Sequence, residues 1–167
     1  AGPFECPYRW RDPNFVVNGV KYRNERPIAV QNAGFWFVSQ ARGWLPREVG
    51  AIIWFAVDDP GTAPITPVYA CSRAISDHYR FGNGSLVTYS PTSMFWTVNR
   101  LAQFCYLNYK WIGNEVHDNV VAHELSMMKK VDSVDAEAIR LYERNPRRAV
   151  RYLTSFSVKA QDELFDK

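Results

Sequence analysis

Two adjacent carboxylates, Asp58 and Asp59, are the side chains in this sequence whose type and placement best suit acid–base chemistry. They follow the continuous apolar run at residues 51–57, which is typical of a fully buried strand. Both carboxylates would therefore lie at an edge of a sheet, where a general acid or base can face a substrate. Residues 58–61 are also an ordinary turn sequence, and residue type alone favours the turn.

A second group of polar side chains lies in an otherwise aromatic stretch. Asn24-Glu25-Arg26 leads to Gln31 and Asn32 within residues 28–40, for which we predict a long strand covered on both faces. A buried amide without a partner costs about 1–3 kcal/mol, so Gln31 and Asn32 need hydrogen bonds. Cross-strand bonds would supply them. The alternative is a cleft in which these amides hold an oxyanion or the termini of a peptide.

The cysteines and histidines indicate neither a metal site nor a local catalytic pair. Cys6, Cys71 and Cys105 are odd in number and lack the CxxC spacing, so no zinc site or closed set of disulfides is expected. No base lies near any of the three in the sequence, as cysteine catalysis would require. His117 and His123 are six residues apart, not the four of a helical zinc motif, and we expect both to be exposed. We expect no metal and no cofactor.

Composition and charge describe one ordinary globular domain. The 167 residues are 47% hydrophobic and carry a formal net charge of +3. Charged residues interrupt every apolar run before it reaches the roughly 20 residues of a membrane-spanning helix. The densest basic run, at residues 140–151, also contains acidic residues and is typical of a solvated helix face. We therefore expect neither a membrane nor a nucleic acid among the partners.

Strand signals fill residues 1–90 and helix signals fill residues 91–167. The expected strands are a hairpin at Asn18-Gly19 and residues 28–40, 51–57 and 67–72. The expected helices begin at Ser90-Pro91, near residue 115, near residues 132–133, at Asn145-Pro146 and after Ser157. This order indicates an α+β fold, with helices laid on one face of an antiparallel sheet.

Several longer segments between about residue 7 and residue 163 resemble segments of a known protein family, in the same order. They are PYRWR (7–11), NERPIAVQNAGFWFVSQ (24–40), IWFAVDD (53–59), FGNGS (81–85), MFW (94–96) with Asn99, and AVRYLTSFS (149–157). In content and order these segments resemble the C69 family of dipeptidases, also called dipeptidase A or U34 peptidases. The resemblance implies an αββα sandwich of the N-terminal nucleophile hydrolase type.

The resemblance also implies where the nucleophile is found. In such hydrolases a cysteine at the mature N-terminus attacks the substrate, and its own α-amine is the base. This chain begins Ala1-Gly2, Cys6 is internal, and the segments match the second half of the family. We therefore expect a C-terminal portion of a cysteine-type dipeptidase, inactive alone, whose nucleophile lies outside these residues.

Within the resemblance, four residues are candidates for the site. Asn32 is the candidate catalytic residue, as a donor to the oxyanion. Arg26, Gln31 and Asp58 are candidates for substrate binding, with Arg26 clamping a carboxylate through its bidentate fork and Asp58 accepting an ammonium group. The expected partners are a dipeptide and the missing N-terminal part of the same protein.

An incomplete sandwich would expose apolar surface that the missing part normally covers. Trp36, Phe37 and Trp54 are the candidate exposed residues, so we expect the isolated chain to self-associate. Two other functions are compatible with the sequence, a non-catalytic binding or assembly module and an amidase of the same superfamily acting on other acyl amides. The compartment stays open between secreted or periplasmic and cytoplasmic.

Overall fold

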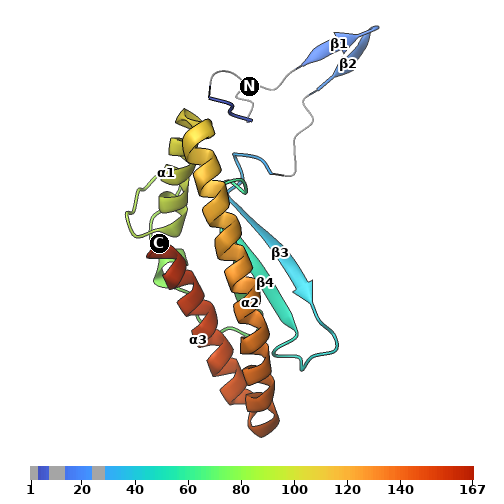
Figure 1. The fold of residues 1–167 in the computed structure, drawn as a ribbon, viewed down its shortest axis with the longest axis vertical. Coiled ribbons are helices and arrows are strands. Elements are labelled where there is room, and N and C mark those ends of the chain that lie inside the picture. Colours follow the sequence, from blue (N-terminus) through green and yellow to red (C-terminus); the bar gives the residue numbers. More distant parts are fainter. Residues whose placement is uncertain (1–3, 8–13, 24–28) are drawn as a thin grey trace.

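The computed structural model describes residues 4–7, 14–23 and 29–167, and its mixture of antiparallel sheets and helices confirms an α+β fold (Figure 1). The strands are β1 (Phe15–Val17), β2 (Val20–Tyr22), β3 (Phe35–Ala41), β4 (Ala51–Val57) and β5 (Thr66–Tyr69). The helices are the 3-10 turn η1 (Asp77–Tyr79), α1 (Met94–Leu107), the π-helical turn η2 (Tyr109–Gly113), α2 (Asn114–Arg144) and α3 (Pro146–Phe165).

The first two strands form a hairpin of their own. β1 and β2 pair antiparallel through the turn at Asn18-Gly19, as the sequence predicts. Both turn residues have positive φ angles, 51° and 79°, which is the geometry that the Asn-Gly pair accommodates in two-residue hairpins.

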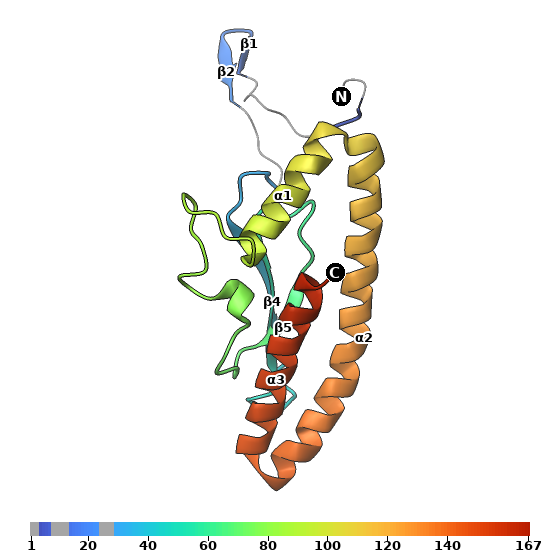
Figure 2. The same cartoon turned by 90° about the vertical axis from the view of Figure 1, so that its left-hand side faces the viewer.

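The larger sheet has the order β3-β4-β5 and is covered on one face by α2 and α3 (Figure 2). Along β4, Ile52, Trp54 and Ala56 are buried in the core shared with these helices, whereas Ile53 is exposed on the opposite face. The prediction of a strand buried on both faces is therefore wrong, because the described residues supply one layer of helices and a strand presents alternate side chains to two faces.

The edge strand β3 is shorter and more exposed than predicted. Residues 29–34 form turns, and regular pairing with β4 begins only at Phe35. Most β3 side chains are exposed, so the expectation that both faces are covered is wrong here too. The strand expected at residues 67–72 is found as β5, which is four residues long.

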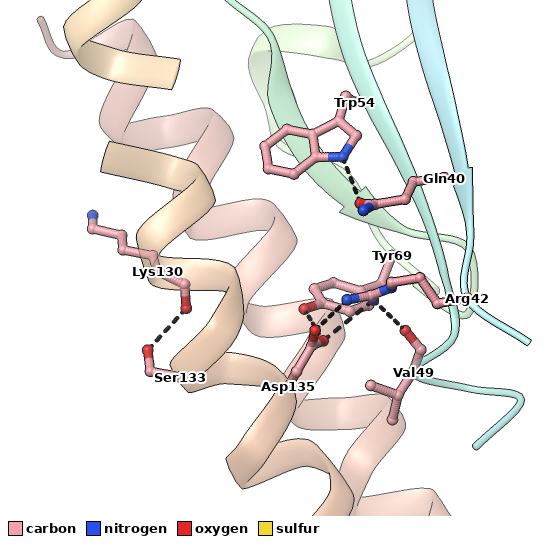
Figure 3. Close-up of polar contacts among 8 residues, drawn as sticks. All are labelled: Gln40, Arg42, Val49, Trp54, Tyr69, Lys130, Ser133 and Asp135. Atoms are coloured by element: carbon pink, nitrogen blue, oxygen red, sulfur yellow. Dashed lines mark hydrogen bonds and ion pairs between the residues drawn. The ribbon is translucent and has the colours of Figure 1, made fainter. Parts of the chain in front are cut away.

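The helical half contains fewer and longer helices than the sequence suggests. The expected break near residues 132–133 is absent, since Ser133 donates its hydroxyl to the carbonyl of Lys130 inside a continuous α2 (Figure 3). Ser157 does not cap a new helix either, because its hydroxyl donates to the Leu153 carbonyl within α3. No described helix has the length and apolar character needed to cross a membrane.

The predicted helix start at Asn145-Pro146 is confirmed, whereas the start of α1 differs. Asn145 accepts a hydrogen bond from the Arg147 N–H at 3.0 Å, and Pro146 occupies the first turn of α3. Helix α1 begins at Met94, with Ser93 as its N-cap, three residues later than the predicted Ser90. Pro91 lies in the turn that precedes it.

A buried polar cluster ties the sheet to α2 (Figure 3). The Arg42 guanidinium forms an ion pair with Asp135 of α2 and donates to the Val49 carbonyl at 2.7 Å. The Tyr69 hydroxyl of β5 donates to the same carboxylate at 2.6 Å. All of these residues are buried, so the cluster connects Arg42, β5 and α2 with little exposure to solvent.

Candidate functional site

Asp58 lies at the end of β4 in a backbone conformation that is unusual for a residue other than glycine. Its φ angle is 66°, and its N–H donates to the carbonyl of Gly34 at 3.0 Å, next to the start of β3. Left-handed backbone at a non-glycine residue is strained and persists where the surrounding structure enforces it, often at functional sites. The pairing of β3 with β4 thus sets the position of this carboxylate.

The Asp58 side chain is 5% exposed and accepts a hydrogen bond from the Asn99 side-chain amide at 3.2 Å. Burial raises the pKa of Asp58 above its ordinary value, an effect that the hydrogen bonds from Asn99 and from the Asp59 backbone partly offset. Within the described part of the chain, no lysine, arginine or histidine forms an ion pair with it. A buried carboxylate of this kind suits a cationic group of a ligand.

The neighbouring Asp59 has a different environment. Its carboxylate is fully buried and accepts the N–H of Gly61 at 2.8 Å and the hydroxyl of Tyr106 at 2.6 Å. Its carbonyl accepts the N–H groups of Thr62 and Ala63, which closes the turn that the sequence favours. Asp59 therefore holds the turn and anchors α1, whereas Asp58 accepts a hydrogen bond from one side chain, that of Asn99.

Two helix residues complete the site, and the sequence reasoning did not connect them with the carboxylates. Asn99 and Tyr106 both lie on α1 and are seven residues apart. This spacing is two helical turns, so it places both side chains on one face. In the sequence, the signal that could have connected them with the carboxylates was an asparagine and a tyrosine seven residues apart on the helix that follows the Asp58-Asp59 turn.

The structure brings the predicted amide loop to the same sheet edge. Gln31 and Asn32 lie in the turns before β3, three and two residues ahead of the Gly34 carbonyl that holds Asp58. The buried Oε1 atom of Gln31 has no hydrogen-bond partner among the described residues, and Asn32 is exposed. Arg26 lies outside the described residues. The roles assigned to these side chains stay predictions.

Burial makes the thiolate form of Cys71 and of Cys105 less favourable. Burial raises the pKa of both Cys71 and Cys105, whereas a nucleophilic thiolate needs a lowered pKa. Cys6 is half-buried, and all three thiols are free. In the ranges 4–7, 14–23 and 29–167, no three His, Cys, Asp or Glu side chains are grouped as metal ligands.

The two histidines of α2 differ, since His117 is exposed as expected and His123 is buried. The expectation of exposure is wrong for His123 because α3 packs beside it and brings Lys167 to 3.4 Å from its Nδ1. Burial lowers the pKa of His123 to about 4, and the charges of Lys167 and Lys130 contribute to the shift against a smaller opposing effect of Glu163.

Replacing His123 with glutamine is expected to make the protein less sensitive to mild acid. The folded side chain stays neutral to about pH 4, whereas the unfolded one takes up a proton near pH 6.5. The unfolded state thus binds more protons in this window, so stability falls as the pH drops through it. Between about pH 7 and pH 5 the original protein should lose about 2 kcal/mol more than the variant, measured by urea unfolding. His117→Gln is the control and should lose as much unfolding free energy between pH 7 and pH 5 as the original protein. If the unfolding free energy of His123→Gln fell with pH as steeply as that of the original protein, the prediction would be contradicted.

Comparisons with known proteins show which sequences this chain is similar to. The model of Peptidase family C69 matches residues 8–121, more than half of the chain. A curated relative, "Probable dipeptidase B" of Streptococcus pyogenes serotype M1, is 23% identical over 152 residues, which cover 91% of this chain and 29% of the relative. The chain thus spans less than a third of the length of that relative. The matched residues include β1 to β5, Asp58 and α1. Because the family model covers more than half of the chain, the chain belongs to peptidase family C69.

Proposed function

We propose that this chain is part of a dipeptidase in which Asp58 binds the α-ammonium group of the substrate. The observation that supports this role is the buried Asp58 carboxylate, which has one side-chain amide donor and no cationic partner in the described residues. A charge-assisted hydrogen bond from an ammonium would satisfy it. Membership of a peptidase family, and a relative named as a dipeptidase, point to a peptide as the source of that ammonium.

The nucleophile in this proposal is a cysteine supplied by polypeptide outside the 167 residues. The α-amine of that cysteine takes the thiol proton, and the thiolate adds to the peptide carbonyl. The peptide C–N bond then breaks as the nitrogen takes this proton, the C-terminal amino acid leaves as the free amine, and water hydrolyses the thioester. Asn32 would donate its amide N–H to the oxyanion, and Gln31 would contact the substrate backbone. Arg26 would pair with the substrate carboxylate.

The exposed outer face of the edge strand β3 supports the presence of further polypeptide in the complete protein. Phe35 is 61% exposed, and Phe37 on the same face of β3 is 53% exposed. Of the aromatic residues expected on an open face, Phe37 is exposed, but Trp54 is buried and donates to the Gln40 Oε1 at 3.0 Å. Trp36 is half-buried. The expectation for these tryptophans is wrong because strand alternation directs them toward the helices.

Serine replacement of Cys6, Cys71 and Cys105, one at a time, is expected to leave dipeptide hydrolysis by the complete protein nearly unchanged. The reason is that burial disfavours the thiolate form of Cys71 and Cys105, and the proposal places the reactive thiol elsewhere. Turnover of dipeptides and of acyl amides by the complete protein, and by residues 1–167 alone, is the measurement. Loss of turnover in Cys6→Ser, or turnover by residues 1–167 alone, would contradict the proposed source of the nucleophile, and a preference for acyl amides would make the protein an amidase.

A further inference from the structure

A cavity of about 510 Å³ lies on the outer face of the larger sheet, away from α2 and most of α3. One wall consists of the outward side chains of β4, Ile53, Phe55 and Val57. Phe95 of α1 and Leu86 of the segment before it also line the cavity, together with polar side chains that include His78 and Arg80. This volume and apolar lining are typical of sites for small organic ligands.

The wall formed by residues 82–92 is held in place by its own hydrogen bonds. The Trp96 indole donates to the carbonyls of Ser85 and Thr88, both at 3.0 Å. The Asn83 side chain accepts the hydroxyls of Ser90 at 2.6 Å and Thr92 at 3.0 Å. A wall formed before a ligand arrives costs little ordering on binding, which distinguishes this cavity from a gap between mobile loops.

The cavity reaches the neighbours of Asp58 and Asn99, although these two residues do not line it. Val57, which lines it, directly precedes Asp58 in the chain, and Phe95, which also lines it, is one helical turn before Asn99 on α1. Asp58 and Asn99 are hydrogen-bonded to each other. From Ile53 to Val57 the cavity floor extends about 13 Å along the strand, which is room for a long side chain.

We propose that this cavity binds the side chain of the N-terminal residue of the substrate, and that the protein prefers dipeptides whose first residue is large and apolar. The inference rests on the proposed function, in which Asp58 holds the α-ammonium. The ammonium and the side chain share one Cα atom, so an ammonium at Asp58 directs the side chain toward Val57 and Phe95. The Asp58 carboxylate matches the ammonium, and the mainly apolar lining of the cavity, which also includes His78 and Arg80, matches the side chain.

The test is a comparison of two neighbouring positions in the complete protein. Leu86 lines the cavity and is 76% exposed, whereas Val87 is 94% exposed and does not line it. Leu86→Trp should narrow the cavity, and Val87→Trp is the matched control with the same added bulk. Because both side chains are exposed, neither variant should disturb folding, and equal melting temperatures would verify this.

Kinetics with Phe-Ala and Gly-Ala are the readout. The original protein should show kcat/KM at least about tenfold higher for Phe-Ala, since each large apolar group in a pocket contributes roughly that much. Leu86→Trp should remove most of this preference by lowering kcat/KM for Phe-Ala much more than for Gly-Ala, and Val87→Trp should alter neither. The inference would be overturned if the original protein showed no preference, or if Leu86→Trp affected both substrates equally or neither. A cavity filled by other polypeptide in the complete protein would give one of these results. Failure of the complete protein to hydrolyse any dipeptide would instead overturn the proposed function.

Discussion

Replacing Asp135 with alanine is expected to lower the free energy of unfolding by about 3–5 kcal/mol. The carboxylate is buried on α2, where it pairs with Arg42 and accepts the Tyr69 hydroxyl. Its removal leaves a buried guanidinium whose remaining acceptor is the Val49 carbonyl. A buried charge that loses its partner retains its full desolvation cost, which exceeds the loss of one hydrogen bond. Urea unfolding at constant slope measures the change.

Two further variants show whether burial of the charge causes this loss. Arg42→Met combined with Asp135→Leu removes both charges, so it should cost much less than Asp135→Ala alone. Arg140→Ala removes an exposed ion pair with Glu137 on the same helix and should cost less than about 1 kcal/mol. If the double variant proved as unstable as Asp135→Ala, the loss would come from packing and not from the unpaired charge.

Replacing Asp58 with asparagine in the complete protein is expected to lower kcat/KM for dipeptides by about 10- to 100-fold, mainly through KM. Hydrogen bonds to charged groups contribute about 1.5–3 kcal/mol, and the carboxamide removes the charge that would attract the ammonium. Stability should stay the same or rise, since burial disfavours the charged form and raises the pKa of Asp58. Steady-state kinetics and thermal unfolding of the same samples give both quantities.

Asp59→Asn is the matched control for this prediction and should show the opposite pattern. Asp59 accepts the Tyr106 hydroxyl and the Gly61 N–H, so its neutralisation should lower the melting temperature and leave KM nearly unchanged. An Asp58→Asn protein with unchanged kinetics and reduced stability would make Asp58 a structural residue. Activity of the original protein should also decline on acidification as Asp58 takes up a proton, at a pH above the ordinary pKa of aspartate.

Local signals in the sequence were enough to predict several elements. The Asn18-Gly19 hairpin and the helix start at Asn145-Pro146 depend on backbone preferences of the residues themselves, and both are present. Ser133 and Ser157 carried the same kind of signal and failed. A serine hydroxyl can cap a new helix or donate to a carbonyl one turn back, and the sequence alone does not distinguish the two. For Ser157, tertiary packing selects the continuous helix, because the same hydroxyl also accepts the Tyr69 N–H from β5.

Burial along α2 was equally beyond local reasoning. His123 is covered because α3 folds back against α2, which no pattern within the helix itself reveals. The same holds for β4, whose continuous apolar sequence suits a strand covered on both faces. How many faces are covered depends on the number of layers in the fold, and that is a property of the tertiary structure.

The sequence by itself determined that two carboxylates follow a buried strand, that amides precede the neighbouring strand, and that the segments match one family of peptidases. Only the tertiary structure decided that the two carboxylates differ. Their partners, Asn99 for Asp58 and Tyr106 for Asp59, lie 41 and 47 residues further along the chain. Which carboxylate is satisfied depends on the position of α1 against the sheet edge, and long-range packing sets that position. For this reason only the folded chain distinguishes Asp58, which the sequence already offered as an acceptor for an ammonium group, from Asp59, which is satisfied by Tyr106 and the turn.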